Sequence, residues 1–415
     1  MRFSLSPRGT LRALFALNVL NYFDRFLAAA VLPLILAELS LSDTQGGALQ
    51  SSLMVVYTVV CPLAGWLATS HSRFRLAGLG ALVFSLATAG SGLAASYGAL
   101  VVARALVGFG EATYAVVTPT LISDSYPPER RGRALSFFYV AIPVGTALGY
   151  QVGGAVGARY GYRTAFFLAA VPGLVLAVAF LLFRDPPRGR MDAGTVAPPA
   201  ASVRETLLTF VRFRSFVFNT AAQTIYTFSM GGLAVWMPTF YQRQHGLTLT
   251  QATMGFGVCV VAAGFLGTLL GGRWGDAWSR RHPDGHFAFS GLALVASLPF
   301  SVGAVMANAP WVYWPCLFGT LFLLFLNTGP LNAAMVNALP THLREKAFGV
   351  NTFCIHALGD VLSPVLIGIA SDRIGLRGPV LVTALLLSLS GVVLLWGRGA
   401  LGRDLASLAA HRRPI

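Results

Sequence analysis

Two adjacent residues of opposite charge, Asp24 and Arg25, lie in the middle of a largely apolar stretch from Ala13 to Ile35. A stretch of this length can cross a lipid bilayer as a helix. One charged side chain at the centre of a membrane-spanning helix costs roughly 2.5 to 3.5 kcal/mol on insertion scales, so such residues usually face a partner or a wet cavity. The pair therefore predicts a polar site inside a membrane protein.

The composition is that of a chain that crosses the membrane many times. Of its 415 residues, 55% are hydrophobic and 11% are charged, and the mean hydropathy is +0.67. Charge-free segments recur, and each is long enough for at least one span of about 20 residues. They lie between Arg75 and Arg104, Arg133 and Arg159, Arg163 and Arg184, Arg214 and Arg243, and Asp284 and Arg344. Together with the interrupted segments, they predict an all-α membrane protein of twelve transmembrane helices.

The twelve predicted spans fall into two groups of six. They begin near Arg12, Asp43, Arg75, Ser96, Arg133 and Arg163, and then near Ser215, Leu249, His286, Pro310, Ala347 and Gly378. The segment between the groups is rich in proline, alanine and arginine, which is typical of a linker. We expect an N-terminal six-helix bundle (1–183), a cytoplasmic linker (184–204), a C-terminal six-helix bundle (205–398) and a cytoplasmic tail (399–415).

Basic residues are concentrated in alternate loops, and this pattern predicts the orientation. The loops after the second, fourth, sixth, eighth and tenth helices are basic, whereas the opposite loops carry fewer arginines. The positive-inside rule then places both termini in the cytoplasm. The formal net charge of +15 is divided among the loops, which favours contact with anionic lipid headgroups and argues against nucleic-acid binding.

Two features that suggest a secreted protein have simpler explanations. The basic start followed by an apolar run resembles a signal peptide, but Asp24 and Arg25 interrupt the run and apolar sequence continues beyond them. The cysteines all fall within predicted spans, so we expect free thiols and no disulfide framework. They are Cys61, Cys259, Cys316 and Cys354.

The two halves of the chain repeat one another at three places, in the same order. The matches are Gly65 to Arg73 with Gly272 to Arg280, Pro127 to Ala134 with Pro340 to Ala347, and Gly154 to Gly161 with Gly368 to Gly375. A parallel repeat of two six-helix halves is the internal symmetry expected of secondary transporters that rock about a central binding site.

On these features the chain resembles the major facilitator superfamily over essentially its whole length. The gating-loop signature Gly-x-x-x-Asp-x-x-x-Arg-Arg is complete in the second half, whereas the first-half copy has Thr69 in place of the aspartate. The signature residues are Gly272, Asp276, Arg280 and Arg281, with Arg73 in the first-half copy. In the family this aspartate caps a neighbouring helix and helps to hold the outward-facing state. The resemblance therefore implies that the latch here rests more on the second-half loop.

The resemblance is closer still to the Spinster branch, through five motifs in order along the chain. They are Asn21 to Phe26, Arg104 to Tyr114, Ala141 to Gly145, Asn327 to Asn332 and Ile355 to Pro364. Known Spinster relatives carry sphingosine phosphates or lysophospholipids. The resemblance thus implies an amphiphilic substrate with a charged head and an apolar chain.

Only Asp24, Glu111 and Asp360 are carboxylates expected at membrane depth, because the other acidic residues lie in loops or at span ends. Arg104 and Glu111 are separated by about two helical turns and share one face. If the first and fourth helices face one another, as in the superfamily, Asp24 and Arg25 can exchange partners with them. A nearby arginine favours the ionised form of a carboxylate and an apolar cavity favours the protonated form, so protonation would decide which ion pairs form.

We therefore predict that Asp24 and Glu111 carry protons, and that Arg25 and Arg104 form ion pairs or bind a substrate headgroup. Alternatives remain open. The four residues could form a static polar clasp that never titrates. Arg104 could simply neutralise Asp24, or could bind a phosphate or carboxylate.

Further polar and aromatic residues are expected to line the substrate cavity. Glycine and proline in the seventh and tenth helices let these helices bend, and amides offer neutral hydrogen bonds. The histidine and aspartate of the eleventh helix form a second titrating pair or simply satisfy each other. The candidates are Tyr22, Tyr114, Tyr226, Trp236, Asn327, Asn332, His356 and Asp360.

Signatures of catalysis and of ATP use are missing from the sequence. The sole lysine, Lys346, follows Glu345, so there is no Gly-x-x-x-x-Gly-Lys-Ser/Thr phosphate loop, and neither His-Glu-x-x-His nor Gly-x-Ser-x-Gly occurs. We expect no enzymatic activity, no metal and no cofactor, with a proton gradient as the energy source.

The preferred hypothesis is a proton-coupled secondary active transporter of an amphiphilic, anionic lipid-like substrate, of the lysophospholipid or sphingoid-phosphate type, working by alternating access. A drug extruder or an organic-acid or sugar-acid proton symporter is the alternative within the class. A non-transporting receptor or scaffold is disfavoured by the intact Asp24, Arg104 and Glu111. We expect a monomer in the bacterial inner membrane, since arginine at nearly every basic position is typical of a GC-rich bacterial source.

Overall fold

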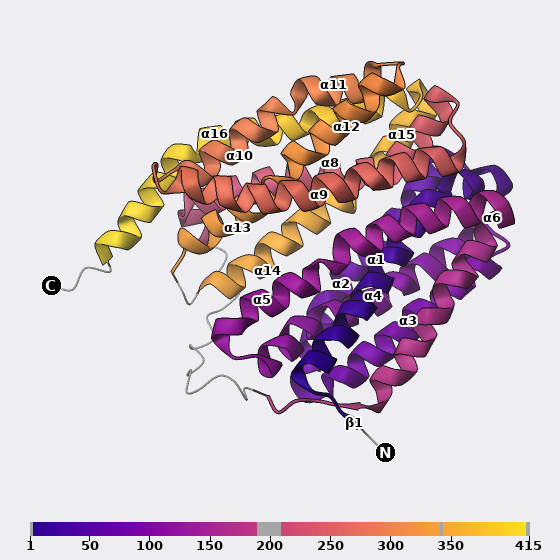
Figure 1. Ribbon diagram of the computed structural model, residues 1–415, viewed down its shortest axis with the longest axis horizontal. Helices are drawn as coiled ribbons and strands as arrows, with labels where there is room; N and C mark the ends of the chain where they lie inside the picture. Colours follow the sequence, from indigo (N-terminus) through magenta and orange to yellow (C-terminus); the bar gives the residue numbers. More distant parts are fainter. Residues whose placement is uncertain (1–2, 189–208, 341–342, 412–415) are drawn as a thin grey trace. The chain divides into compact units, whose positions relative to one another are not determined.

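The computed structural model describes residues 3–188, 209–340 and 343–411. Within these ranges the chain is almost entirely helical (Figure 1), as the sequence predicts. The exception is a short parallel pairing of β1 (Phe3–Ser4) with β2 (Phe183–Arg184). Most of the predicted linker, from residue 189 on, lies outside the described residues.

The helices follow the two-half order of the sequence. The first half forms α1 (Pro7–Glu38), α2 (Asp43–Ser70), α3 (Arg73–Leu93), α4 (Tyr97–Ser125), α5 (Pro128–Tyr139) and α6 (Ala141–Leu182). The second half forms α8 (Arg214–His245), α9 (Leu249–Ser279), α10 (Gly285–Ala296), α11 (Leu298–Met306), α12 (Pro310–Phe325), α13 (Thr328–Asn337), α14 (Arg344–Ile355), the π-helical turn η2 (His356–Asp360), α15 (Ser363–Ile374) and α16 (Arg377–His411). The last helix thus continues beyond residue 398, where we placed the start of the tail.

Serine side chains fix the starts of four of these helices. The hydroxyl oxygens of Ser6, Ser42, Ser72 and Ser96 accept hydrogen bonds from backbone N–H groups in the first turns of α1, α2, α3 and α4. Ser42 also forms a full capping box with Gln45. Because a serine hydroxyl replaces a hydrogen-bond partner that the first turn lacks, these positions are strong helix starts.

Ten helical segments of the described residues are long and apolar enough to cross a membrane. Two structural details account for the difference from twelve. The segment Arg133–Leu182 holds two predicted spans, which meet where Gly161 adopts φ 82° and ψ 160° and interrupts the helix. The helix α8 is 32 residues long but is not among the ten, since polar residues such as Asn219 and Gln223 lower its hydropathy.

The chain divides into two compact units, and each takes residues from both halves of the sequence. Unit 1 comprises Met1–Val196, Ala234–Val258 and Pro364–Asp372, and unit 2 comprises Ala197–Leu233, Cys259–Ser363 and Arg373–Ile415. Unit 1 therefore contains α1 to α6 together with the end of α8, the start of α9 and most of α15.

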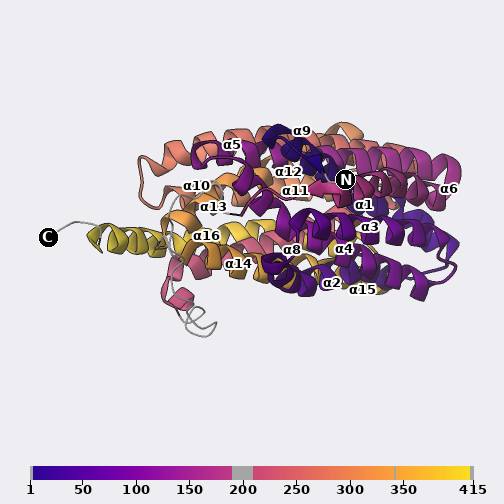
Figure 2. The same cartoon turned by 90° about the horizontal axis from the view of Figure 1, so that it is seen from below.

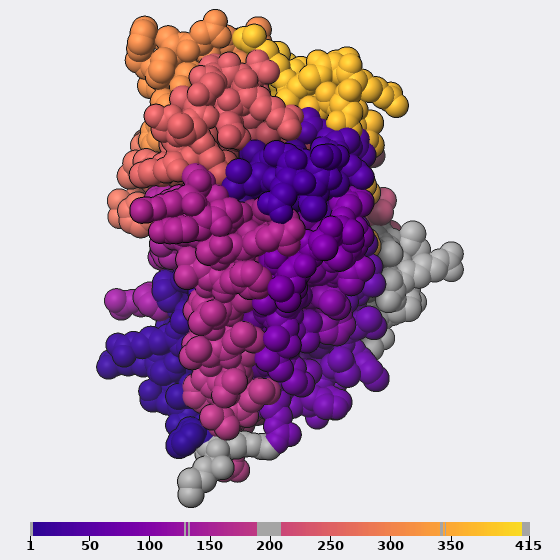
Figure 3. Space-filling view, turned by 90° about the vertical axis from the view of Figure 1, so that its right-hand side faces the viewer, coloured from indigo at the N-terminus to yellow at the C-terminus, as the bar shows by residue number. Residues whose placement is uncertain are grey.

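Within unit 1, α1 packs along α6, α3 packs against α4 and α6, and α2 packs against α4. These first-half helices run alongside one another in Figures 1 and 2, and they form a continuous surface, indigo to magenta, on the face shown in Figure 3. Glycines permit the close approach. A Cβ at Gly108 would overlap the backbone carbonyl of Leu53, and one at Gly110 would overlap that of Gly80. Such small residues let helices approach closely in lipid, where dispersion contacts supply most of the packing energy.

Unit 2 has its own apolar core, formed where α10 and α11 pack against α16. One buried cluster joins α8, α10, α13 and α16 through Ala222, Phe287, Leu294, Leu331, Ala334, Ala338, Leu394 and Leu401.

Gly108→Val is expected to destabilise unit 1, because its side chain would occupy space taken by the main chain of α2. Overpacking typically costs about 1 to 3 kcal/mol. Thermal unfolding of the purified protein in detergent should therefore give a lower Tm than wild type. Gly98→Val, also in α4, is the control, since nothing lies within 4 Å of an added Cβ there. Equal losses of Tm would show that the approach of α2 to α4 is not the cause.

Candidate functional site

The four charged residues predicted at membrane depth form two buried ion pairs in unit 1. Arg104 Nη1 donates to Asp24 Oδ2 at 3.2 Å, and Arg25 Nη2 donates to Glu111 Oε2. The side chains of Asp24 and Arg104 are each 2% exposed, Glu111 is fully buried, and Arg25 is 13% exposed. The helices α1 and α4 thus place opposite charges against one another within a largely apolar bundle.

Helix geometry explains why each acid has its own arginine. Asp24 and Arg25 are consecutive on α1, so their side chains leave the helix about 100° apart. Arg104 and Glu111 lie on one face of α4, about 10 Å apart along its axis. The two neighbours on α1 therefore reach partners at two different levels of α4.

Neutral residues from other helices complete the surroundings of the pairs. Thr88 of α3 donates its hydroxyl to Asp24 Oδ1 at 2.8 Å. The Arg25 guanidinium lies 5.4 Å from the ring centroids of both Tyr22 and Tyr57, which gives it favourable cation–π contacts. Thr88 and Tyr57 were not predicted, because threonine and tyrosine are common in membrane helices and nothing local marks these two.

Several polar atoms of the pairs have no hydrogen-bond partner among the described residues. They are Glu111 Oε1, Arg104 Nη2 and Arg25 Nε, all of them buried. Buried polar atoms without partners are rare and costly, so each calls for an explanation such as a functional role. A clasp that served packing alone would be expected to satisfy its charges more fully.

A small cavity lies beside Arg104. Its volume is about 20 Å³, and its lining includes Leu32, Gln50, Phe166 and Val235. A space of this size holds about one water molecule. In this structure the guanidinium of Arg104 therefore meets a water-sized cavity and not a cavity that fits a lipid headgroup.

In unit 2, His356 and Asp360 form a polar pair within η2. The Nδ1 atom of His356 lies 3.0 Å from both carboxylate oxygens of Asp360, and the side chains are 22% and 17% exposed. Gly231 of α8 lies against Asp360, where any larger side chain would overlap its Cβ. Single π-turns inside helices occur frequently at functional sites, so the pair remains a candidate.

Tyrosines predicted for the cavity lie in different environments. Tyr22 contacts Arg25 through its ring. Tyr114 lies on α4 about one turn beyond Glu111, and it is 2% exposed. Tyr226 packs against the apolar cluster of unit 2.

Trp236, Asn327 and Asn332 use their polar atoms on the protein backbone. Trp236 is fully buried, and its indole N–H donates to the carbonyl of Pro364 at 2.9 Å. The Asn327 amide donates to the carbonyl of Leu323 at 2.8 Å, and the Asn332 amide donates to that of Thr328 at 2.9 Å. Each of these bonds ties one polar group of the side chain to the backbone, and the place of the three residues in the substrate cavity stays a prediction.

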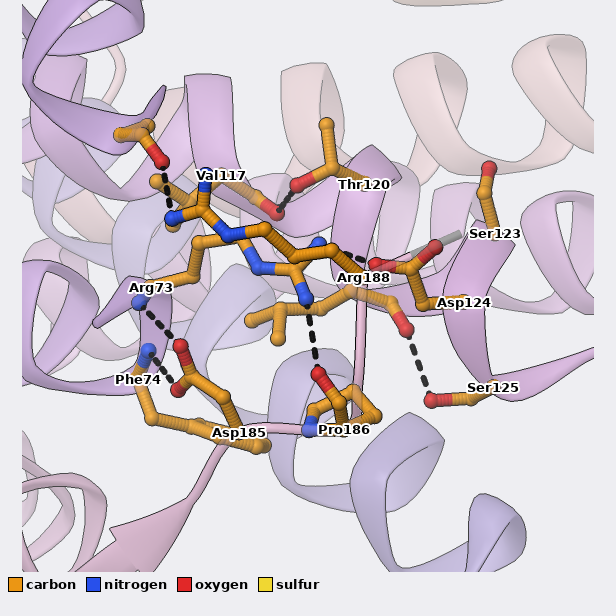
Figure 4. A network of polar contacts seen from close by, with 12 residues as sticks. Arg73, Phe74, Val117, Thr120, Ser123, Asp124, Ser125, Asp185, Pro186 and Arg188 are labelled. Carbon is orange, nitrogen blue, oxygen red and sulfur yellow. Dashed lines mark hydrogen bonds and ion pairs between the residues drawn. The ribbon is translucent and has the colours of Figure 1, made fainter. Parts of the chain in front are cut away.

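The first-half gating loop binds the segment that follows α6 (Figure 4). Arg73 pairs with Asp124 at the end of α4 and donates to the carbonyl of Pro186 at 3.1 Å. Asp185 accepts hydrogen bonds from the backbone N–H groups of Arg73 and Phe74, at 2.7 and 2.9 Å. It therefore caps the N-terminus of α3, where a negative charge is favoured.

Arg188 caps the end of α2 in the same network. Its guanidinium donates to the carbonyls of Ala68 and His71, at 2.6 and 2.8 Å, and to that of Thr69. A cation at a helix C-terminus satisfies free carbonyls and complements the helix dipole. Thr69, which stands where the family has aspartate, turns its own hydroxyl back to Trp66. An arginine of the linker thus organises this loop.

The second-half gating loop lies at the end of α9 in unit 2. Asp276, Arg280 and Arg281 are exposed there, and the backbone N–H of Arg280 donates to the carbonyl of Asp276 at 3.0 Å. Gly272 lies against Gly329. The role of this loop as a latch stays a prediction.

The pairing of Arg25 with Glu111 can be measured with a double-mutant cycle. Arg25→Gln and Glu111→Gln each leave one buried charge without its partner, and breaking a buried pair typically costs about 3 to 5 kcal/mol. The double variant should lose clearly less stability than the sum of the single losses. The free energies would come from unfolding in detergent with increasing denaturant. Strict additivity would show that the two side chains do not interact.

Most of the chain matches a known protein family and its relatives. Residues 14–364 match the family described as Major Facilitator Superfamily. Protein spinster of Drosophila melanogaster is 32% identical over 376 residues, which cover 88% of this chain and 62% of that protein. Protein spinster homolog 3 of Danio rerio is 31% identical (86% and 75%), and protein spinster homolog 1 of Homo sapiens is 32% identical (88% and 72%). The chain therefore spans less than two thirds of the Drosophila protein.

Solved structures share the fold at low sequence identity. A bacterial homolog to the human lysosomal transporter Spinster, in an inward-facing and unoccupied conformation, aligns with a TM-score of 0.86 at 21% identity, covering 96% of this chain and 98% of that one. A D-xylose-proton symporter aligns with a TM-score of 0.74 at 16% identity, covering 92% and 96%.

Proposed function

Because the chain belongs to the major facilitator superfamily and to its Spinster group, we propose that it is a proton-coupled secondary active transporter of an amphiphilic, anionic lipid-like substrate that works by alternating access. It is a multi-pass membrane transporter and not an enzyme. We further propose that protons are the coupling ions and that Asp24 and Glu111 couple proton movement to substrate movement.

The proposal rests above all on the two buried ion pairs of unit 1. Protonation of Glu111 would leave Arg25 as an uncompensated buried charge, and removal of one partner typically costs about 3 to 5 kcal/mol. Inverting a two-state equilibrium from 1:99 to 99:1 takes about 5.5 kcal/mol. One proton at this site therefore supplies an energy of the size that switching requires.

Protonation of Asp24 would likewise affect substrate binding, because Asp24 is the ion-pair partner of Arg104. Arg104 binds Asp24 with one nitrogen, while Nη2 has no partner among the described residues. A planar guanidinium binds phosphate or carboxylate with two parallel hydrogen bonds. Protonation of Asp24 would release Arg104 to an anionic headgroup, once the water-sized cavity beside it widens.

An anionic lysophospholipid or sphingoid phosphate supplies such a headgroup together with an apolar chain for the aromatic and aliphatic walls. His356 and Asp360 are a second candidate site for proton transfer. We further propose that the transporter is a monomer in a bacterial inner membrane, with both termini in the cytoplasm and no cofactor besides the proton gradient.

A second candidate is a proton symporter of a small organic or sugar acid, and a drug extruder belongs to the same group. The cavity beside Arg104 holds about one water molecule, so it has to widen for either class of substrate, and a compact acid requires the smaller widening. A thermal-shift screen of lysophospholipids, sphingoid phosphates, sugar acids and cationic drugs would separate these classes.

Glu111→Gln and Asp24→Asn should each abolish the dependence of transport on a pH gradient. Each amide is nearly isosteric with the acid but cannot exchange a proton. Uptake of a fluorescent lysophospholipid would be followed in proteoliposomes, with and without an imposed gradient. Glu38→Gln is the matched control, because Glu38 pairs with Arg163 in a half-exposed position. A full gradient response in both buried variants would refute proton coupling through these residues.

Arg104→Ser should weaken binding of an anionic lysophospholipid by about tenfold or more, since hydrogen bonds to charged groups contribute about 1.5 to 3 kcal/mol. Binding of an uncharged monoacylglycerol of the same chain length should change little. Titration calorimetry with purified protein gives both dissociation constants. Equal loss for the two lipids would identify Arg104 as a structural residue.

A further inference from the structure

A second polar cluster joins α2, α8 and α15 at the end of the helices opposite the N-terminus. Arg243 donates to Asp43 with both Nη1 and Nη2, at 2.7 and 2.9 Å. The hydroxyl of Ser371 donates to Asp43 Oδ2 at 2.6 Å. We call Asp43, Thr44, Arg243, Ser371 and Asp372 the Asp43 cluster; all of its members belong to unit 1.

Asp372 caps the N-terminus of α2 from a distant part of the chain. Its carboxylate accepts hydrogen bonds from the backbone N–H groups of Asp43 and Thr44, at 2.8 and 3.0 Å, and from the Thr44 hydroxyl at 2.6 Å. This helix already has a local cap from Ser42, which binds the N–H of Gln45. The carboxylate therefore adds to a helix start that is stable by itself, and its main effect is to hold α15 against α2.

The backbones of α2 and α15 touch beside the cluster. A Cβ at Gly47 would overlap the carbonyl of Pro364, and a Cβ at Gly368 would overlap the carbonyl of Asp43. No side chain separates the two helices at these points. The polar contacts thus lie along a tightly closed seam.

The internal repeat relates the α2–α15 seam to a second seam between α6 and α9. Comparison of the two shows that the charged residues of the Asp43 cluster occur at the α2–α15 seam alone among these two. Gly154 of α6 corresponds to Gly368 in the repeat. It packs against the side chain of Thr253 of α9, whereas Gly368 meets the backbone of α2. Counted from the matching glycines Gly65 and Gly272, Asp43 corresponds to Thr250, whose hydroxyl lies 3.5 Å from the Gly154 carbonyl. Asp372 corresponds to Ala158. Both seams have a glycine at the close approach, but among the described residues the ion pair and the carboxylate cap occur at the α2–α15 seam.

The cluster joins the two halves of the sequence. Asp43 and Thr44 belong to the first six-helix half, whereas Arg243, Ser371 and Asp372 belong to the second. In a transporter whose halves rock against one another, contacts that join the halves at one end must break when that end opens. The ion pairs of Asp24 and Glu111 lie within the first half and carry no such requirement.

We propose that the Asp43 cluster is a latch that holds this end of the transporter closed, with Arg243 and Asp372 as its positioning residues. The proposal rests on alternating access but not on the nature of the substrate or of the coupling ion. Arg243 holds α8 to the start of α2, and Asp372 holds α15 to the same turn. Loss of either contact weakens the closed end and raises the share of open molecules, and release of both frees the α2–α15 seam to part.

The test measures opening directly, without substrate and without a pH gradient. Spin labels are placed at Ala95 in the α3–α4 loop and Asn308 in the α11–α12 loop, both exposed. The alternation of the spans along the chain predicts that these two loops lie on the same side of the membrane. The background has its four cysteines replaced, and distances are measured in lipid nanodiscs. Arg243→Ala and Gly368→Val should each shift the distance distribution to longer values, since one removes the charge pair and the other forces the seam apart. Arg243→Lys, which keeps the charge but loses the bidentate geometry, should give a smaller shift.

Two matched controls lie at the same end of the helices. Glu38→Gln breaks an ion pair with Arg163 that joins α1 and α6, both from the first half. Gly98→Val adds a side chain where there is open space. Neither should move the label distance. If Gly368→Val fails to fold, Arg243→Ala alone decides the result.

Unchanged distances in Arg243→Ala, or an equal shift in Glu38→Gln, would overturn the latch. A loss of Tm without a change in distance would mean that the cluster only stabilises the fold. Failure of proton coupling or of lipid transport leaves these measurements unaffected, so the latch and the proposed function are judged separately.

Discussion

The packing of the first-half helices depends on ion pairs between carboxylates and guanidinium groups inside an apolar helix bundle. The desolvation of two ions is costly, and their mutual attraction repays that cost only in good geometry. In unit 1 the geometry requires α1 and α4 to meet at a fixed rotation and level, so that Asp24 reaches Arg104 and Arg25 reaches Glu111. Thr88 and the rings of Tyr22 and Tyr57 then replace part of the lost water. The packing of the first half is in this sense arranged around two charges.

The Asp43 cluster applies similar chemistry at a helix end, with a different consequence. There the partners come from different halves of the sequence and their contacts are partly exposed: the side chain of Arg243 is 41% exposed, against 2% for Arg104. Water can therefore replace the lost partners when the contacts break, so breaking them costs far less than breaking a fully buried pair. The partly exposed position of the Asp43 cluster suits contacts that open and close in each transport cycle. The fully buried position of the Asp24 and Glu111 pairs suits contacts that respond to protonation.

Particular residues show what the sequence could predict and where it stopped. Asp24, Arg25, Arg104 and Glu111 were identifiable because a charge in an apolar span is costly wherever it lies. Contacts between distant helices were not identifiable. Thr88, Tyr57 and the partners of Asp43 depend on the crossing and register of helices, which local patterns do not encode. The hydrogen bond from the Trp236 indole N–H to the carbonyl of Pro364 likewise joins residues far apart in the sequence. Gly161 ends one span and starts the next through a positive φ, which periodicity does not reveal.

The anchoring of Asp185 and Arg188 also bears on how far the two halves of the chain can separate. A connecting segment limits such movement by its contour length, about 3.3 to 3.6 Å per residue when fully extended. Asp185 and Arg188 are bound to the ends of α3 and α2, so the four residues that follow β2, up to Arg188, add nothing to the length over which the two halves can separate. The maximal length available for that separation is therefore about 14 Å shorter than the number of residues between the spans suggests, and loss of Arg188 would increase it.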